Sequence, residues 1–271
     1  MPDRRDLAAA LSGLSAETFT SSRRRTWDVL RVGSGPAVIV VHEVPGITPL
    51  VAAFAREVAR RDMTAVLPSL LGTPGRAPTV GYTLAAAARA CVSREFAMLA
   101  TDRSSPVTDD LRDLATAEHA RCGGPGVGVV GMCLTGNFAL AMSVDPIVLA
   151  PVMSQPALPL TIGARRRAAV GVAPDDLARV RARVDEGLCV MGLRFSGDAK
   201  VPAERFDTLR RVLGDGFVGV EIDSSPTNPW GYSRSAHSVL TQDLGDQAGS
   251  PTRVALERVL DFLATRLDVG A

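Results

Sequence analysis

Gly131-Met132-Cys133-Leu134-Thr135-Gly136 is the stretch of sequence that decides the fold. It follows the apolar run 127–130 and precedes the apolar run 138–142. This order predicts a strand, a tight turn and the start of a helix, with Cys133 at the apex of the turn. A turn this sharp accepts only small residues two positions to either side of its apex, here Gly131 and Thr135. The stretch is therefore predicted to be a nucleophile elbow, with a thiol in place of the usual serine hydroxyl.

The composition favours one folded domain without a charged macromolecular partner. Of 271 residues, 46% are hydrophobic, which is enough for one sizeable core. The net charge of +1 predicts neither nucleic acid nor an anionic membrane as a partner. The sequence shows no secretory signal and no apolar run long enough to span a membrane. We therefore expect a cytoplasmic monomer or small homo-oligomer with a single domain over residues 1–271, made of an N-terminal extension (1–30) and a core (31–271).

The cysteine pattern predicts neither a metal site nor disulfides. The four cysteines, Cys91, Cys122, Cys133 and Cys189, lack the spacing of metal ligands, and in a reducing compartment they should be free thiols. Three of them are expected to be small buried apolar residues. Only Cys133 lies in a turn that would present it. We expect no organic cofactor either, because nucleophilic catalysis by a thiol needs none.

Predicted strands and helices alternate along the chain. The β-branched run 37–41 is typical of a strand covered on both faces. The alternation favours an α/β fold with a mostly parallel central sheet and helices on both faces. Strands are predicted over residues 26–32, 37–41, 64–67, 127–130, 147–150, 189–195 and 217–222, and helices over 49–61, 82–100, 107–120, 175–185, 204–213 and 252–267. Residues 3–20 are predicted to be a short helix followed by a loop.

A thiol nucleophile needs a base, and the chain has three histidines. His42 ends a predicted strand, and His119 ends a predicted helix, where a cation suits the helix dipole. In the α/β-hydrolase fold the nucleophile comes first along the chain, the acid second and the histidine last. His237 is the only histidine after Cys133, and it is therefore the predicted base.

The acid that orients this base is expected after a strand, between Cys133 and His237. Asp198 fits because it follows a predicted strand end and Gly197. Asp215, in a Gly-Asp-Gly turn, and Asp223, at the end of the last predicted strand, are the alternatives. Asp198 is favoured over both.

Residues 42–46, His-Glu-Val-Pro-Gly, end a central predicted strand, at the edge where α/β folds bind ligands. In this fold the loop here supplies one N–H of an oxyanion hole, and the residue after the nucleophile supplies the other. We therefore expect the N–H groups of Val44 and Leu134 to hold an oxyanion. Taken alone, Glu43 would be a loop carboxylate in solvent.

Together these residues resemble the dienelactone hydrolase family (carboxymethylenebutenolidase-like) of α/β hydrolases. The resemblance extends over about residues 36–240. It is carried by His42-Glu43-Val44-Pro45-Gly46, which is similar to the family's His-Glu-x-x-Gly, by the elbow 131–136, which is similar to its Gly-x-Cys-x-Gly-Gly, by Gly197-Asp198 with Val201-Pro202, and by His237.

The resemblance implies a hydrolase that cleaves a small-molecule lactone or ester with Cys133, His237 and Asp198. Cys133 would rest as a neutral thiol until substrate binding lets Glu43 take its proton. The thiolate would attack the carbonyl carbon while the N–H groups of the two oxyanion residues hold the oxyanion. His237, oriented by Asp198, would then activate water to cleave the thioester.

The family also binds a substrate carboxylate with arginine side chains. By resemblance, Ser238 matches a polar substrate contact and Arg94 is a candidate carboxylate ligand, for which Arg234 could substitute. Trp230 could form a wall of the pocket. Thr241 stands where the resemblance leads us to expect an arginine, so the substrate need not be a dienelactone.

Two other functions fit the same residues. A thioesterase or acyltransferase could use the same triad on a thioester. A protein of this fold without catalytic activity could instead bind a small ligand or sense oxidation at Cys133. The combination of Cys133, His237, Asp198 and Glu43 favours the enzyme, because a binding protein has no need of all four.

Overall fold

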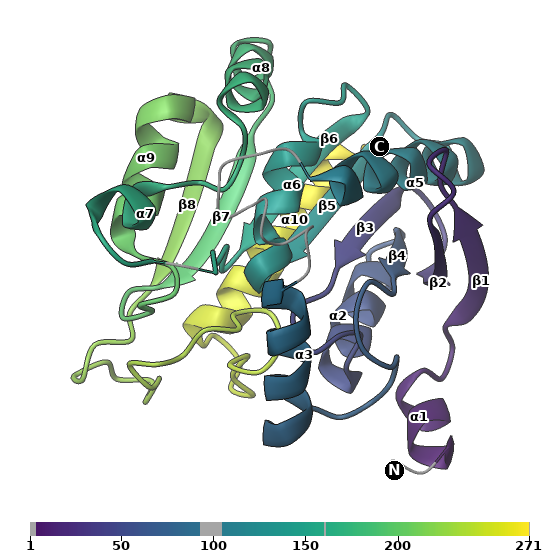
Figure 1. Ribbon diagram of the computed structural model, residues 1–271, viewed down its shortest axis with the longest axis horizontal. Helices are drawn as coiled ribbons and strands as arrows, with labels where there is room; N and C mark the ends of the chain where they lie inside the picture. Colours follow the sequence, from purple (N-terminus) through teal and green to yellow (C-terminus); the bar gives the residue numbers. More distant parts are fainter. Residues whose placement is uncertain (1–3, 93–104, 160, 271) are drawn as a thin grey trace.

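The computed structural model describes residues 4–92, 105–159 and 161–270, which build an eight-stranded sheet of order β1-β2-β4-β3-β5-β6-β7-β8 (Figure 1). The neighbours from β4 to β8 run parallel, whereas β2 pairs antiparallel with both β1 and β4. The predicted mostly parallel sheet is therefore confirmed. The strands are β1 (Ser15–Thr20), β2 (Thr26–Gly33), β3 (Ala37–Val41), β4 (Thr64–Pro68), β5 (Val127–Met132), β6 (Val148–Ser154), β7 (Val190–Phe195) and β8 (Phe217–Ile222).

Helices cover both faces of this sheet, as predicted (Figure 1). The apolar side chains of α2 and α10 pack on one face, and those of α5, α6 and α9 pack on the other. The α-helices are α1 (Arg4–Ala10), α2 (Pro49–Ala59), α3 (Val80–Val92), α5 (Pro106–Cys122), α6 (Gly136–Met142), α7 (Ala164–Ala168), α8 (Pro174–Asp185), α9 (Ala203–Leu213) and α10 (Pro251–Arg266). The 3₁₀ turns are η1 (Cys133–Thr135) and η2 (Gly214–Gly216).

The central strand β3 explains why its sequence is apolar throughout. All five of its residues are buried, since helices cover both sides of the sheet at this point. The chain then enters α2 through Thr48, whose hydroxyl accepts a hydrogen bond from the N–H of Val51 at 3.3 Å, and Pro49 opens the helix. Thr48 and Pro49 thereby fix the point at which α2 begins.

One predicted loop is a strand. Residues 15–20 were expected to lie in a loop, but they form β1, which pairs with β2 along its whole length. Most of β1 is exposed, so its sequence lacks a buried face, and the strand depends on its pairing with β2. Phe19 stacks on Trp27 across this pair, with ring centroids 6.5 Å apart. The end of the helix predicted over 82–100 lies outside the described residues.

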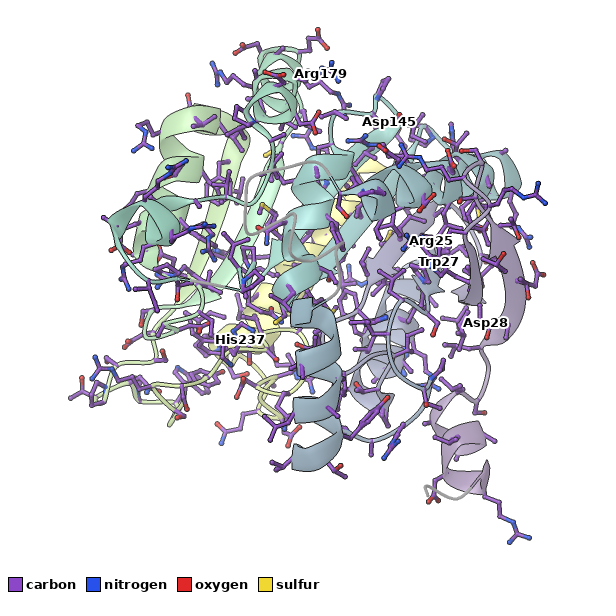
Figure 2. The ribbon with its side chains drawn as sticks, viewed as in Figure 1. Arg25, Trp27, Asp28, Asp145, Arg179 and His237 are labelled. Carbon is purple, nitrogen blue, oxygen red and sulfur yellow. The ribbon has the colours of Figure 1, made fainter. Side chains whose placement is uncertain are left out.

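The order of the strands creates a crevice at their carboxyl ends. β3 lies between β4 and β5. The chain passes from β3 to β4 on one side of it, and then crosses from β4 to β5 on its other side. Ligands bind at such a switch point in open α/β sheets. Figure 2 shows His237 at this carboxyl edge, on the side of the molecule opposite Asp145, which precedes β6. No helix in the described part of the chain is long and apolar enough to cross a membrane.

Candidate active site

Cys133 occupies a strained turn between β5 and α6. Its φ of 59° lies in the left-handed region, which is costly for a residue with a side chain and persists where the surroundings enforce it. A Cβ on Gly131 would stand 2.3 Å from the carbonyl oxygen of Thr135, and one on Gly136 would stand 2.8 Å from Cα of Pro156. The close approach of the backbone therefore requires glycine on both sides of the turn.

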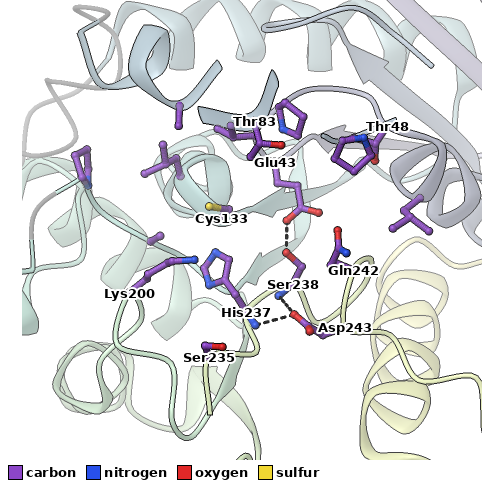
Figure 3. Close-up of a pocket in the computed structure, with 18 of the residues that line it drawn as sticks. Glu43, Thr48, Thr83, Cys133, Lys200, Ser235, His237, Ser238, Gln242 and Asp243 are labelled. Carbon is purple, nitrogen blue, oxygen red and sulfur yellow. Dashed lines mark hydrogen bonds between the residues drawn. The ribbon is translucent and has the colours of Figure 1, made fainter. Parts of the chain in front are cut away.

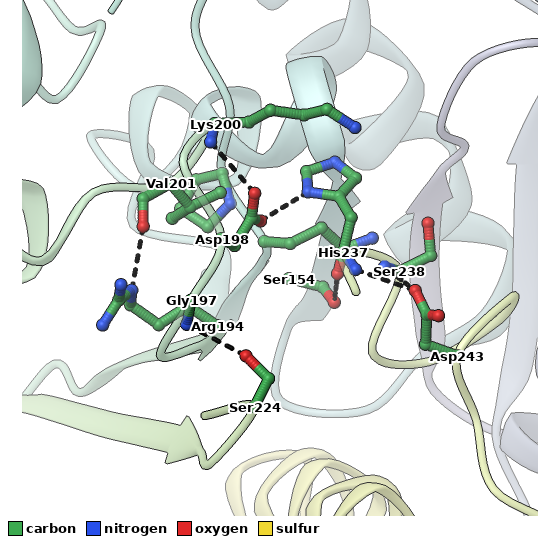
Figure 4. Close-up of polar contacts among 12 residues, drawn as sticks. Ser154, Arg194, Gly197, Asp198, Lys200, Val201, Ser224, His237, Ser238 and Asp243 are labelled. Carbon is green, nitrogen blue, oxygen red and sulfur yellow. Dashed lines mark hydrogen bonds and ion pairs between the residues drawn. The ribbon is translucent and has the colours of Figure 1, made fainter. Parts of the chain in front are cut away.

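His237 and Asp198 meet at the carboxyl edge of the sheet (Figure 4). His237 Nδ1 is 2.5 Å from Asp198 Oδ2, and Asp198 Oδ1 accepts the N–H of Lys200 at 3.0 Å. The loop that carries Asp198 is braced by the buried Arg194, which donates to the carbonyl of Val201 at 2.9 Å. The two side chains come from loops that follow β7 and β8, so neighbouring strands deliver them to one place.

The charge state of His237 is set by its two neighbours. Burial works against a charged ring, but the negative charge of a Cys133 thiolate and the hydrogen bond to Asp198 outweigh it and raise the pKa of His237 to about 10. The Nε2 atom is buried, and a hydrogen bond between the ring and Cys133 contributes to the raised pKa. Figure 3 shows the imidazole beside Cys133. In this arrangement the imidazole can accept the proton of the Cys133 thiol.

Glu43 lies on another side of Cys133 and is buried. Its carboxylate accepts from three neutral donors: the Gln155 amide at 3.2 Å, the Ser238 hydroxyl at 2.7 Å and the Thr241 hydroxyl. These donors satisfy a buried carboxylate without a cation. The residue is thus far from the solvated loop position that its sequence context alone would give.

His42 fixes the loop that carries Glu43. The N–H of Leu70 donates to His42 Nε2 at 3.1 Å, so the ring proton resides on Nδ1, which donates to the carbonyl of Glu43 at 2.9 Å. Complete burial lowers the pKa of His42 to about 4 despite its backbone bonds. His42 is therefore neutral at physiological pH and acts as a brace.

The loop that carries His237 has its own anchor. Asp243 Oδ2 accepts the N–H groups of both His237 and Ser238 at 2.8 Å (Figures 3 and 4). One carboxylate thus holds two consecutive backbone donors, which fixes the direction in which the imidazole and the Ser238 hydroxyl leave the chain. This anchor connects the position of His237 to that of Glu43, because Ser238 bonds to Glu43.

A cavity of about 590 Å³ brings most of the predicted site residues together (Figure 3). Its size suits a small organic molecule. The predicted residues that line it are Glu43, Val44, Cys133, Leu134, His237 and Ser238, and its apolar walls include Leu50, Pro78, Ala87 and Leu158. Lys200, Gln242 and Asp243 add polar groups to the lining.

Two of the predicted substrate contacts lie outside this cavity. Trp230 and Arg234 are exposed and do not line this cavity. Arg94 lies outside the described residues. Of the alternative acids, Asp223 bonds to Ser225, and Asp215 lies in the turn that precedes β8, at the opposite end of that strand from His237.

Within the residues that the structure describes, no group of three or more His, Cys, Asp or Glu side chains could hold a metal ion. Cys122, Cys133 and Cys189 are free thiols.

The strand order and the cavity at the carboxyl edge define the α/β-hydrolase fold. A profile of the dienelactone hydrolase family matches residues 29–166, just over half of the chain. The chain belongs to the dienelactone hydrolase family and is by that membership a hydrolase. Asp198 and His237 lie beyond the matched range. No curated protein sequence matches the chain.

Solved structures show the same fold. A candidate dienelactone hydrolase from Klebsiella pneumoniae is 18% identical with a TM-score of 0.60, and the match covers 93% of this chain and 98% of that one. The α/β hydrolase GrgF from Penicillium is 15% identical with a TM-score of 0.60, covering 94% and 99%. A puromycin-hydrolyzing peptidase from Mycobacterium tuberculosis is 16% identical with a TM-score of 0.61, covering 98% of this chain and 40% of that one. At these identities the likeness concerns the fold alone.

Several residues of the site escaped the sequence analysis. Gln155 is fully buried at a φ of 36° directly after β6, but its sequence context, Ser-Gln-Pro, indicates only the start of a loop. In the sequence, nothing distinguishes Asp243 and Lys200 from charged residues on the protein surface. Thr241 was noted only because an arginine was expected there. The position of Gln155 at a strand end is the one local signal that could have drawn attention to it.

Proposed function

We propose that this chain hydrolyses a carboxylic ester or lactone through Cys133, His237 and Asp198, with a thioester intermediate. One observation carries the proposal. Cys133 lies at positive φ in the elbow and shares a pocket with His237, whose Nδ1 is 2.5 Å from Asp198 Oδ2. This is the relation of nucleophile, base and orienting acid that covalent acyl transfer requires.

The first step forms the thioester. The Cys133 thiolate attacks the carbonyl carbon, and the carbonyl oxygen becomes an oxyanion that the N–H groups of Val44 and Leu134 stabilise. When the intermediate collapses, the bond between the carbonyl carbon and the leaving oxygen breaks. The leaving alkoxide takes its proton from His237, while the acyl group stays on sulfur.

The second step releases the acid. With Cys133 acylated, the thiolate charge that raises the pKa of His237 is gone, so the ring can become neutral. Nε2 then takes a proton from water as the oxygen of that water attacks the thioester carbonyl. Breaking of the carbon–sulfur bond gives the carboxylic acid and regenerates the thiolate and the imidazolium.

The position of His237 beside Cys133 in the pocket, with its other ring nitrogen bonded to Asp198, supports the imidazole as the acceptor of the thiol proton. Glu43, which the family resemblance makes the proton acceptor, is instead occupied by hydrogen bonds from three donors. We therefore propose that Glu43 orders the pocket and supplies negative charge. A reducing compartment such as the cytoplasm would keep the thiol available for this chemistry.

The decisive experiment compares the wild type with Cys133→Ala on a dienelactone, a neutral aryl ester and an acyl thioester. We expect hydrolysis that depends on Cys133, and a mass increase equal to the acyl group on the wild type alone. Turnover of the thioester only would make the protein a thioesterase. Equal turnover by Cys133→Ala, or no acyl adduct with any substrate, would refute the mechanism.

A second experiment locates the proton. NMR titration should find His237 protonated up to a pH near 10 in the wild type, and should find a lower pKa in Cys133→Ala, because the thiolate charge is missing. An unchanged pKa would show that Cys133 does not share its proton with His237.

A further inference from the structure

A buried hydroxyl lies between the elbow and β3, and the proposed chemistry makes no use of it. Thr135 is 1% exposed. Its Oγ1 accepts the N–H of Met132 at 2.9 Å. Three carbonyl oxygens surround the same atom, those of Val41 at 2.7 Å, Met132 at 2.8 Å and His42 at 3.2 Å.

The hydroxyl has one proton to donate, and the nearest acceptor is the carbonyl of Val41. The Met132 N–H, the Thr135 hydroxyl and the Val41 carbonyl thus form a chain of two hydrogen bonds from β5 to β3. The register between these strands ends where Val41 faces Gly131. The side chain therefore continues the connection between β3 and β5 beyond the last paired residues.

Both parts of the expected oxyanion hole leave the sheet at this point. Val44 lies three residues beyond Val41, and Leu134 lies two residues beyond Met132. The two N–H groups belong to separate loops, so their spacing depends on what ties those loops together. Donors aimed at an oxyanion work because their geometry is fixed before the reaction, and small displacements are costly.

We propose that Thr135 is a positioning residue that sets the spacing of the two oxyanion donors and thereby the rate of thioester formation. The proposal rests on the proposed function. The dienelactone hydrolase elbow that this stretch resembles has glycine at this position, which offers no hydroxyl. The link between β3 and the elbow is therefore a property of this chain's own elbow.

The test compares Thr135→Val, which keeps the shape but loses the hydroxyl, with Thr135→Ser, which keeps the hydroxyl. Rapid mixing with a neutral aryl ester gives the rate of thioester formation, steady-state kinetics give KM, and iodoacetamide gives the alkylation rate of Cys133. Alkylation forms no oxyanion, so it reports the thiol without the two donors. Thr135→Gly, the residue of the family elbow, repeats the loss of the hydroxyl with less crowding in case the valine variant fails to fold.

We expect Thr135→Val and Thr135→Gly to slow thioester formation about 10- to 100-fold, with KM and alkylation within about threefold of the wild type. Thr135→Ser should stay within about threefold in every measurement. If the valine and serine variants form the thioester equally fast, or if alkylation and thioester formation fall together, the positioning role is wrong. A wild type that forms no thioester with any ester would instead refute the proposed function, and the positioning role with it.

Discussion

Asp198 and Glu43 are both buried carboxylates beside the pocket, but their partners differ in kind. Asp198 meets an ionisable ring, His237, and a backbone N–H. Glu43 meets one amide and two hydroxyls, none of which gains or loses a proton near neutral pH. Each carboxylate is compensated for its lost hydration, yet only Asp198 is coupled to a group that can carry a proton.

This difference indicates that the two carboxylates have different roles in the site. A carboxylate paired with an imidazole stabilises the imidazolium, so its charge affects the energy of every step in which the ring gains or loses a proton. A carboxylate held by neutral donors has no partner that carries a proton, and its hydrogen bonds fix the side chains around it. We therefore propose that the Asp198 side takes part in proton transfer and that the Glu43 side orders the pocket, and variants on each side should separate the two roles.

The largest effect is expected from Asp198→Asn. The amide removes the charge that supports the imidazolium and favours the wrong ring tautomer, so kcat for ester hydrolysis should fall about 10³- to 10⁴-fold. The pKa of His237 should fall as well, which NMR titration can follow. Asp223→Asn, at the alternative acid, is the matched control and should leave kcat within about twofold. Similar losses in both variants would mean that His237 has no single orienting acid.

A smaller effect is expected from Glu43→Gln. The new amide cannot accept from Ser238 and Thr241 on both of its polar atoms, so the loop should shift and kcat/KM should fall about 10- to 100-fold. The pH dependence of Cys133 alkylation by iodoacetamide should not change, because in the proposed mechanism the thiol proton goes to His237. A pH profile displaced from that of the wild type would identify Glu43 as the proton acceptor, as the family resemblance implies.

The same contrast explains what could be predicted from the sequence. Cys133, Asp198 and His237 are singled out by local patterns: a turn between apolar runs, a strand end, and the order along the chain. The mostly parallel sheet follows from alternating apolar segments. Of the donors to Glu43, Thr241 leaves no such trace and Gln155 leaves only its place at a strand end. They are 198 and 112 residues away from Glu43 and meet it only in the folded chain. β1 was missed for a related reason, because its partner strand, and not a buried face of its own, makes it a strand.

A milder test removes the neutral donors one at a time. Ser238→Ala and Thr241→Val each take one hydroxyl from the Glu43 carboxylate, and each should lower kcat/KM about 3- to 10-fold, in line with the net contribution of one typical hydrogen bond. Because both act on the same carboxylate, their effects should not add in the double variant. Ser225→Ala, which removes a hydroxyl bonded to the exposed Asp223, is the matched control and should have no measurable effect. Fully additive losses would mean that the two hydroxyls act separately, for instance on the substrate.

The smallest effect is expected from Lys200→Met, which removes the charge of the Lys200 side chain but keeps the backbone of the Asp198 loop. The N–H that holds Asp198 belongs to the main chain and survives the substitution, so kcat for a neutral aryl ester should stay within about twofold. The ammonium group of the exposed Lys200 lines the pocket, and its loss should raise KM for a carboxylate-bearing ester up to about fivefold, the range of an exposed ion pair. Lys200→Arg should preserve KM for both esters. If Lys200→Met lowered kcat on the neutral ester as much as Asp198→Asn, the ammonium group, and not only the backbone of the loop, would support the imidazole. Asp198, His237 and Lys200 would then form a network of charges.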